Sequence, residues 1–469
     1  MVTVVQLVRA SDCGSECRGF ESHQSPEEVL SNQKIAEDFS FIINITTFAL
    51  NIHHYLSMNT YSINYKKAFC LCFALITTVH SIFAQVEKDV YTSSYLLDDT
   101  KEKTINLEIE NLNFFQNNEY GGGVMKGYTL PGLWITPKLT YQPTSNLKLE
   151  AGIHALLYHG AYKFPNYAYI DIPKWKGNQY QKGAHLLPHF SAQLALGNVN
   201  FILGSLHGAS NHNLITPLYE PELTLTADPE MGFQILFDKP RFHLDVWVNW
   251  QSFIFDIDSH QEAFIVGLNT KYNFHKGESP WQGYLHLQGV IQHRGGEQDN
   301  TGEVNTLMNG AFGGGVTRKF EHKFFNSLNL EANFLGYFQQ AGNLWPFNKG
   351  AGFYASTKLQ MIKHLYLQAG YFVGHQFISI LGLPYFGAVS TANGEGVFND
   401  YPKTLHLAID YSHAFNHQYA AGAKLSIYHS TPGKRTLANG NIEIPVSSTN
   451  FAIGVYLKTD FAFLLKKFN

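Results

Sequence analysis

The sequence predicts an all-β protein, a transmembrane antiparallel up-and-down β-barrel of about 16 strands with short periplasmic turns and long outer loops. Three observations predict this fold class. Only 15% of the residues are charged, against about 25% in ordinary soluble domains, while 14% are aromatic. Apolar and polar side chains alternate with a period of two residues, which is the period of a strand. Short and long connections between these segments alternate along the chain.

The composition also excludes other classes of protein. Beyond Gln85, no apolar run approaches the ~20 residues that a membrane helix needs. The formal net charge of −4 provides no basic patch, so nucleic acid is not an expected partner.

About sixteen segments are long enough for the ~9–11 residues of a tilted membrane strand. They are 104–116, 128–141, 147–158, 186–197, 199–207, 230–237, 241–255, 263–274, 281–294, 306–318, 328–338, 350–361, 364–377, 404–415, 418–429 and 447–465. The largest connections are 159–185, 208–229, 378–403 and 430–446, and turns of a few residues lie between the long connections. An even strand count places both ends of the barrel on the periplasmic side.

The last segment carries the clearest alternation. Phe451, Ile453, Val455 and Leu457 share one face, and Ala452, Gly454, Tyr456 and Lys458 share the other. With the aromatic Phe468 one residue from the end, this segment resembles the closing strand of Gram-negative, porin-like outer-membrane β-barrels. The resemblance implies that the strand pairs with the first strand and carries the signal read by the outer-membrane assembly machinery. It also implies a location in the cell outer membrane.

The N-terminal residues are separated from the fold. Residues 1–24 resemble the translated product of a transfer-RNA gene, and 1–57 is interpreted as a spurious extension. Residues 58–84 have the charged start, apolar core and small final residue of a secretory signal peptide. We expect 85–103 to be a polar periplasmic lead and 104–469 to be the barrel.

No residue pattern points to a cofactor or a metal. The four cysteines all precede Gln85, so the expected mature chain has no disulfide, thiolate ligand or thiol nucleophile. Histidines four residues apart, such as His185 and His189, would lie ~13 Å apart on a strand. Neither a zinc motif nor a calcium loop is present in the sequence.

Aromatic residues gather near the expected strand ends. They are Trp134, Tyr141, Tyr158, Trp281, Tyr284, Tyr337, Phe338 and Tyr366. As a set they are expected to form the aromatic girdles found at the level of the lipid headgroups.

Charged and histidine side chains on the polar faces are expected to line the lumen, because lipid offers no partner for a charge. The candidates are Glu108, Glu110, Lys148, Glu150, His154, His243, Asp245, Lys271, Glu331, Lys358, His406, Asp410, Lys424 and Lys458. Opposed rows of charge would sort solutes by charge at a constriction. The alternative is that these groups pair with one another across a filled interior.

A serine hydrolase is a further alternative, because some outer-membrane barrels are lipases, deacylases or proteases. His207 and Ser210 stand close together at the start of a long outer loop, and they are weak catalytic candidates. Their arrangement departs from the His-x-Ser pattern of lipid A deacylase barrels.

The favoured interpretation is a porin-like channel for passive or substrate-selective diffusion of small polar solutes, with sugars among the candidates and no turnover chemistry. The expected partners are outer-membrane lipid, these solutes and the assembly machinery, and porin resemblance suggests a homo-oligomer. Two other functions stay open, namely a lipid or lipopolysaccharide hydrolase and a surface scaffold or receptor that binds polysaccharide or protein.

Overall fold

The computed structural model describes residues 86–121, 124–158, 183–253, 261–275, 279–296, 302–361, 364–389, 397–415, 418–431, 434–436, 442–443 and 448–468. The proposed extension and signal peptide, and most of loop 159–185, lie outside these residues. In the part of the chain that is described, no helix is both long enough and apolar enough to cross a membrane.

Sixteen antiparallel strands form one closed barrel. They are β1 (Thr104–Gly121), β2 (Lys126–Thr144), β3 (Leu147–Tyr158), β4 (Gly183–Leu196), β5 (Val199–Ser205), β6 (Met231–Lys239), β7 (Phe242–Ser252), β8 (Ala263–Asn273), β9 (Trp281–Arg294), β10 (Asn305–Lys319), β11 (Ser327–Ala341), β12 (Lys349–Gln360), β13 (Leu365–His375), β15 (Lys403–Ala414), β16 (Tyr419–Ser430) and β19 (Ser448–Lys467). Each predicted segment overlaps one of these strands, so the predicted fold class is confirmed.

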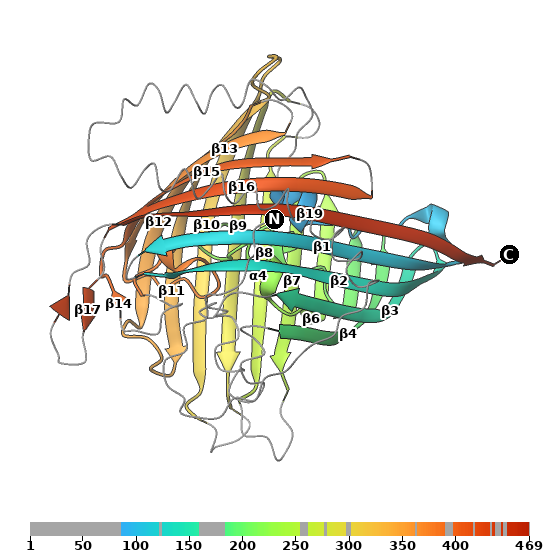
Figure 1. Cartoon of the computed structure of the whole chain (residues 1–469), viewed down its shortest axis with the longest axis horizontal. Helices are drawn as coiled ribbons and strands as arrows, with labels where there is room; N and C mark the ends of the chain where they lie inside the picture. The colour runs from blue at the N-terminus through green and yellow to red at the C-terminus, as the bar shows by residue number, and fades with distance from the viewer. Residues whose placement is uncertain are drawn as a thin grey trace, which may run out of the picture. The chain divides into compact units, whose positions relative to one another are not determined.

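The closing strand pairs with the first strand, as the resemblance implies. β19 runs antiparallel to β1 with a register from Thr104 opposite Lys467 to Glu119 opposite Phe451. Figure 1 shows the two strands side by side. A closed ring leaves no unpaired strand edge, which is the condition for a sheet in lipid.

The outward face of the barrel is apolar. On β3, Leu149, Ile153 and Leu157 are 39%, 46% and 43% exposed, while the side chain of His154 faces the interior and is buried. Exposed leucine and phenylalanine side chains of this kind occur around the wall. Their exposure to water would be unfavourable, whereas contact with the hydrocarbon chains of a membrane is favourable. The protein is therefore an outer-membrane β-barrel.

The short turns close the strands tightly at one end of the barrel. Between β4 and β5 the connection is only Gly197 and Asn198, and Gly197 has a φ of +64°. A residue with a Cβ is strained in that left-handed region, so glycine fits the turn. A small separate sheet of β14 (Val397–Phe398), β17 (Lys434–Thr436) and β18 (Ile442–Glu443) lies in the outer loops.

Three segments fold into the lumen. We call them the strap (residues 86–101, with the short helices η1, Glu87–Tyr91, and η2, Asp99–Lys101), loop A (206–230) and loop B (376–389). Loop A includes the short helices η5 (Ala209–His212) and α4 (Leu223–Thr226), and loop B includes η6 (Pro384–Phe386). The sequence predicts a periplasmic lead at 85–103 and outer loops at 208–229 and 378–403, but the described parts pack against the inner wall.

Loops A and B form an apolar core inside the barrel. Their fully buried side chains include Leu218, Leu225, Phe377, Ile378 and Phe386. Two contacts join the loops: the Glu220 amide donates to the Leu381 carbonyl, and the Ser379 hydroxyl donates to the Pro217 carbonyl. Asn309 of β10 holds loop B to the wall, because its side chain bonds the backbone of both Ile378 and Ile380. The lumen is thus largely filled rather than open across its width.

The predicted aromatic girdles are only partly present. Tyr141, Trp281 and Phe338 point outward and are 37%, 50% and 48% exposed. Five others, Trp134, Tyr158, Tyr284, Tyr337 and Tyr366, occupy inward positions of their strands. An aromatic residue near a strand end has no intrinsic preference for either face, so the alternation of its neighbours decides the matter.

Candidate active site in the barrel lumen

A cavity of about 460 Å³ lies between the barrel wall and the lumen segments. Its wall is built mainly by inward residues of β1 to β5 and β19, and the strap and loop A cover it from the lumen side. The lining reaches from Lys148, near the periplasmic turn before β3, to Gln251, near the outer end of β7. The cavity therefore follows the wall over much of the height of the barrel.

Paired charges occupy the periplasmic part of the cavity. Glu150 lies 2.6 Å from the Lys148 ammonium and 3.4 Å from the Lys138 ammonium. Lys138 also lies 2.9 Å from Glu110, and Lys101 of the strap lies 2.7 Å from Glu108. Apart from Lys101, these groups are on the neighbouring strands β1, β2 and β3, and strand alternation points them inward.

A histidine and a serine share the cavity-facing side of β4. His189 and Ser191 are two residues apart, and Phe190 between them is 51% exposed on the outer face. The His189 Nε2 atom lies 3.0 Å from Glu150 Oε2, and Ser191 stands opposite Glu150 in the register of β3 and β4. A carboxylate, an imidazole and a hydroxyl therefore meet on one patch of wall.

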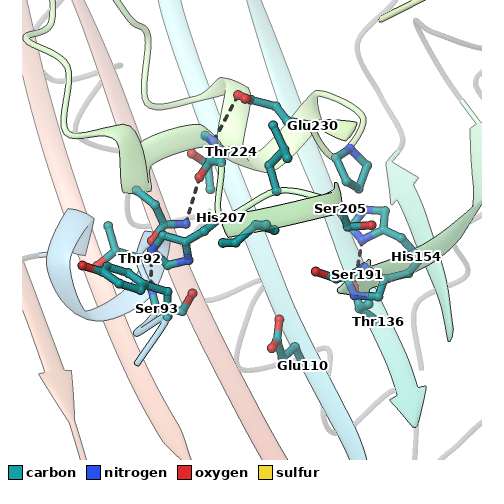
Figure 2. Close-up of a pocket in the computed structure, with 18 of the residues that line it drawn as sticks. Thr92, Ser93, Glu110, Thr136, His154, Ser191, Ser205, His207, Thr224 and Glu230 are labelled. Atoms are coloured by element: carbon teal, nitrogen blue, oxygen red, sulfur yellow. Dashed lines mark hydrogen bonds between the residues drawn. The ribbon is translucent and has the colours of Figure 1, made fainter. Parts of the chain in front are cut away.

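A second histidine extends this polar wall. The His154 Nδ1 atom lies 2.8 Å from the Thr136 hydroxyl, and its ring lies against Trp134. Figure 2 shows Thr136, His154, Ser191 and Ser205 together on one side of the cavity, with Glu110 below them.

On the opposite side lie the strap and His207 of loop A, as Figure 2 also shows. The His207 backbone bonds the Gln234 side chain through both its amide and its carbonyl. Burial lowers the pKa of His207 to about 4, and neighbouring His212 adds to the effect. The His207 imidazole is therefore neutral near pH 7 and carries no positive charge into the cavity.

His212 binds loop A to the barrel wall. Its Nδ1 atom lies 2.7 Å from Asp245 Oδ2, its Nε2 atom lies 2.9 Å from Glu230 Oε2, and its ring stacks on Trp247 with centroids 3.5 Å apart. Burial alone would lower the pKa of His212, but the two carboxylates outweigh burial and raise it to about 9. The imidazolium thus links two carboxylates, one from β7 and one from loop A.

The predicted catalytic pair is not assembled as a pair. His207 lines the cavity, but the Ser210 hydroxyl bonds the Thr224 hydroxyl at 2.6 Å, within loop A. Sequence reasoning missed Ser191 and considered His189 only as half of a metal pair. The signal was present as His189-Phe190-Ser191, a His-x-Ser pattern on a strand, where alternate residues share a face.

All fourteen predicted lumen residues occupy inward positions of their strands. Six of them, Glu108, Glu110, Lys148, Glu150, His154 and Lys458, line the large cavity, while His406 and Lys424 line a second cavity of about 50 Å³. Asp245 belongs to the His212 cluster, and Asp410 accepts a bond from the Val86 amide of the strap. The remaining four pair locally: His243 with Asp238, Lys271 and Glu331 with Tyr284, and Lys358 with Tyr366.

Within the described ranges, no group of three or more histidine, cysteine or acidic side chains is arranged to hold a metal ion.

Comparison with known proteins gives one family and several structures. Residues 97–468 match the model of a family described as lipid A 3'-O-deacylase-type. No curated protein matches the sequence. Among solved structures, OprD of Pseudomonas aeruginosa matches at 8% identity, 79% coverage of this chain, 98% of its own chain and a TM-score of 0.43. OccAB1 of Acinetobacter baumannii matches at 9% identity, covering 79% of this chain and 100% of its own, with a TM-score of 0.42. A loop-deletion form of OmpT of Vibrio cholerae matches at 9% identity, covering 76% of this chain and 99% of its own, with a TM-score of 0.41.

Proposed function

Because the chain belongs to the lipid A 3'-O-deacylase-type family, we propose that it is an outer-membrane hydrolase that cleaves acyl esters in the lumen cavity. One observation carries the proposal: Glu150, His189 and Ser191 line one patch of the cavity wall, with His189 Nε2 3.0 Å from Glu150 Oε2 and Ser191 opposite Glu150 in the strand register. An activated serine needs a base within reach and a third group that orients the base.

The reaction would follow from these positions. The Ser191 hydroxyl attacks the ester carbonyl and passes its proton to His189, and Glu150 orients the imidazole and stabilises its positive charge. His189 then gives that proton to the departing alcohol, which leaves an acyl group on Ser191. Water, deprotonated by His189, attacks this acyl group and releases the fatty acid, and the serine regains its proton.

The cavity also indicates which part of a substrate it would hold. Its wall offers hydroxyls of Thr136 and Ser205 and the ring of Trp134 beside the paired charges. Hydroxyls, carboxylates and an aromatic face suit a sugar that carries acyl chains. An acylated sugar such as lipid A, the substrate in the family's description, fits this lining better than a wholly apolar ester would.

The substitution Ser191→Ala tests the proposal. We expect acyl release from purified lipid A to fall at least about a thousandfold, because loss of the nucleophile removes the covalent route. Mass spectrometry of lipid A incubated with the folded barrel would measure the lost acyl chains.

Ser210→Ala is the matched control, because its hydroxyl bonds Thr224 within loop A and does not line the cavity. We expect it to retain most of the activity. Equal activity of Ser191→Ala and wild-type protein would refute the assignment, and heat-modifiable gel migration would confirm that each variant has folded.

A channel for small polar solutes is the second candidate. It is favoured by the length of the cavity, whose lining runs from Lys148 near the periplasmic turns to Gln251 near the outer strand ends. Selection would be passive, by size and by the charges of Lys138, Glu150 and their neighbours. Because loops A and B fill the rest of the lumen, we expect only small single-channel conductance in planar bilayers. Flat current traces from folded protein would exclude this function.

A further inference from the structure

A group of cations and aromatic rings lies at the periplasmic end of the outer barrel surface, apart from the cavity. We call it the basic rim, and it consists of Lys239, Arg318, Lys323 and Lys466 with the rings that they contact. The Arg318 guanidinium carbon lies 4.8 Å from the Trp281 ring centroid and 5.5 Å from that of Phe320. The Lys466 ammonium lies 4.6 Å from the Phe468 ring centroid.

Arg318 is the best-defined member of this rim. It is exposed on the outward face of β10, and the register places it opposite Trp281 of β9 and Leu328 of β11. Trp281 is 50% exposed. No ion pair joins Arg318 to a carboxylate among the residues whose positions are described, although the exposed Glu321 is in the turn that follows.

We propose that Arg318 and Trp281 form a binding site for the phosphate group of an anionic phospholipid in the periplasmic leaflet. The turn end of the barrel meets that leaflet. At this depth the indole lies at the level of the headgroups, and the guanidinium can donate two parallel hydrogen bonds to phosphate oxygens. The ring holds the arginine along the barrel surface, so the side chain loses little freedom when it binds.

The neighbouring turn strengthens the assignment to a lipid over a free anion. Phe324 and Phe325 are 56% and 40% exposed beside His322 and Lys323. The exposed parts of these apolar rings have a favourable position in the upper part of an acyl-chain layer, whereas a dissolved anion would give them none. The site is independent of the proposed hydrolysis.

The test compares wild-type protein with Arg318→Met, which keeps the apolar stem and removes the charge. The barrel is folded in micelles that contain phosphatidylglycerol and phosphatidylcholine, and native mass spectrometry counts the lipids that remain bound. We expect Arg318→Met to retain about fivefold less phosphatidylglycerol, because one cation at a membrane surface contributes about 1 kcal/mol. Arg318→Lys should fall between the two, because it keeps the charge but loses the planar donor pair.

Lys349→Met, an exposed lysine at the outer end of β12, is the control and should retain lipid as the wild type does. Equal retention by Arg318→Met and wild-type protein would overturn the proposal. Displacement of the lipid by excess inorganic phosphate would also overturn it, because the site would then bind a free anion without regard to the lipid.

Discussion

At the scale of single residues, His212 shows how a buried charge can hold a loop inside a barrel. The imidazolium has a carboxylate on each ring nitrogen and an indole beneath its ring. Removing one partner of such a buried group usually costs several kcal/mol, because the remaining charge has no solvent. His207, whose pKa is lowered by burial and by His212, is neutral near pH 7.

This geometry predicts a pH dependence for loop A. The pKa of His212 is about 9 in the folded protein and about 6.5 in an unfolded chain, so its contribution is fully present below pH about 6.5. It is lost as pH rises through about 9, and its size is on the order of 3 kcal/mol. We therefore expect hydrogen exchange of residues 206–230 to quicken between these pH values, beyond the intrinsic increase.

The variant His212→Gln provides the comparison, since glutamine can accept and donate hydrogen bonds but does not titrate in this range. Its loop A should exchange faster than that of wild-type protein at pH 6, and the difference should shrink at high pH. A wild-type protection pattern that is the same at both ends of the range would contradict the role of the charge.

The histidine and serine of the cavity show what can be recognised residue by residue. The triplet His189-Phe190-Ser191 can be recognised in the sequence, and the two-residue period of a strand places His189 and Ser191 on the same face. The carboxylate partner, Glu150, is 39 residues away from His189 and reaches it only because β3 and β4 are paired in this register. No local pattern could have supplied that partner.

At the scale of elements, the strap is held by contacts that span the barrel. The Val86 amide donates to Asp410 of β15, and Lys458 of β19 donates to the Thr92 carbonyl. The Gln193 side chain of β4 donates to the Tyr95 carbonyl, on the far side of the cavity. The strap therefore crosses the lumen and covers the cavity.

Deletion of residues 86–96 should uncover the cavity without unfolding the barrel, because no strand of the closed sheet includes these residues. We expect single-channel conductance to rise severalfold relative to wild-type protein, since the narrowest part of the path would be widened. Tyr95→Phe, which removes only the hydrogen bond to Asp238, is the matched control and should change the conductance little. Unchanged conductance in the deletion variant would show that loops A and B alone close the lumen.

At the scale of the whole molecule, the barrel combines an apolar outer surface with a lumen that has its own apolar core. The apolar outer surface can contact lipid acyl chains, and the closed ring of strands leaves no backbone edge unpaired. Inside, Leu218 and Phe386 are buried in the manner of a soluble protein core. The cavity lies on one side of this core, where the wall residues are charged. Covering these charges with apolar side chains would cost a large desolvation free energy.

The sequence by itself determined the strands, their facing and their closure. A two-residue period over sixteen segments places polar and apolar residues on opposite faces, and a long apolar outward face in a charge-poor chain is stable only in lipid. These are local properties of the chain, so the inward positions of residues such as Glu108 and Lys424 follow from alternation.

Only the tertiary structure decided what the lumen contains. Loops 208–229 and 378–403 have the length and polarity of outer loops, yet their described residues fold inward and pack on each other through Glu220, Leu381 and Ser379. Whether a connection turns outward or inward depends on contacts between segments more than 150 residues apart, such as the 162 residues between Pro217 and Ser379. Such contacts leave no periodic signal in the sequence, because each depends on a single pair of side chains brought together by closure of the barrel.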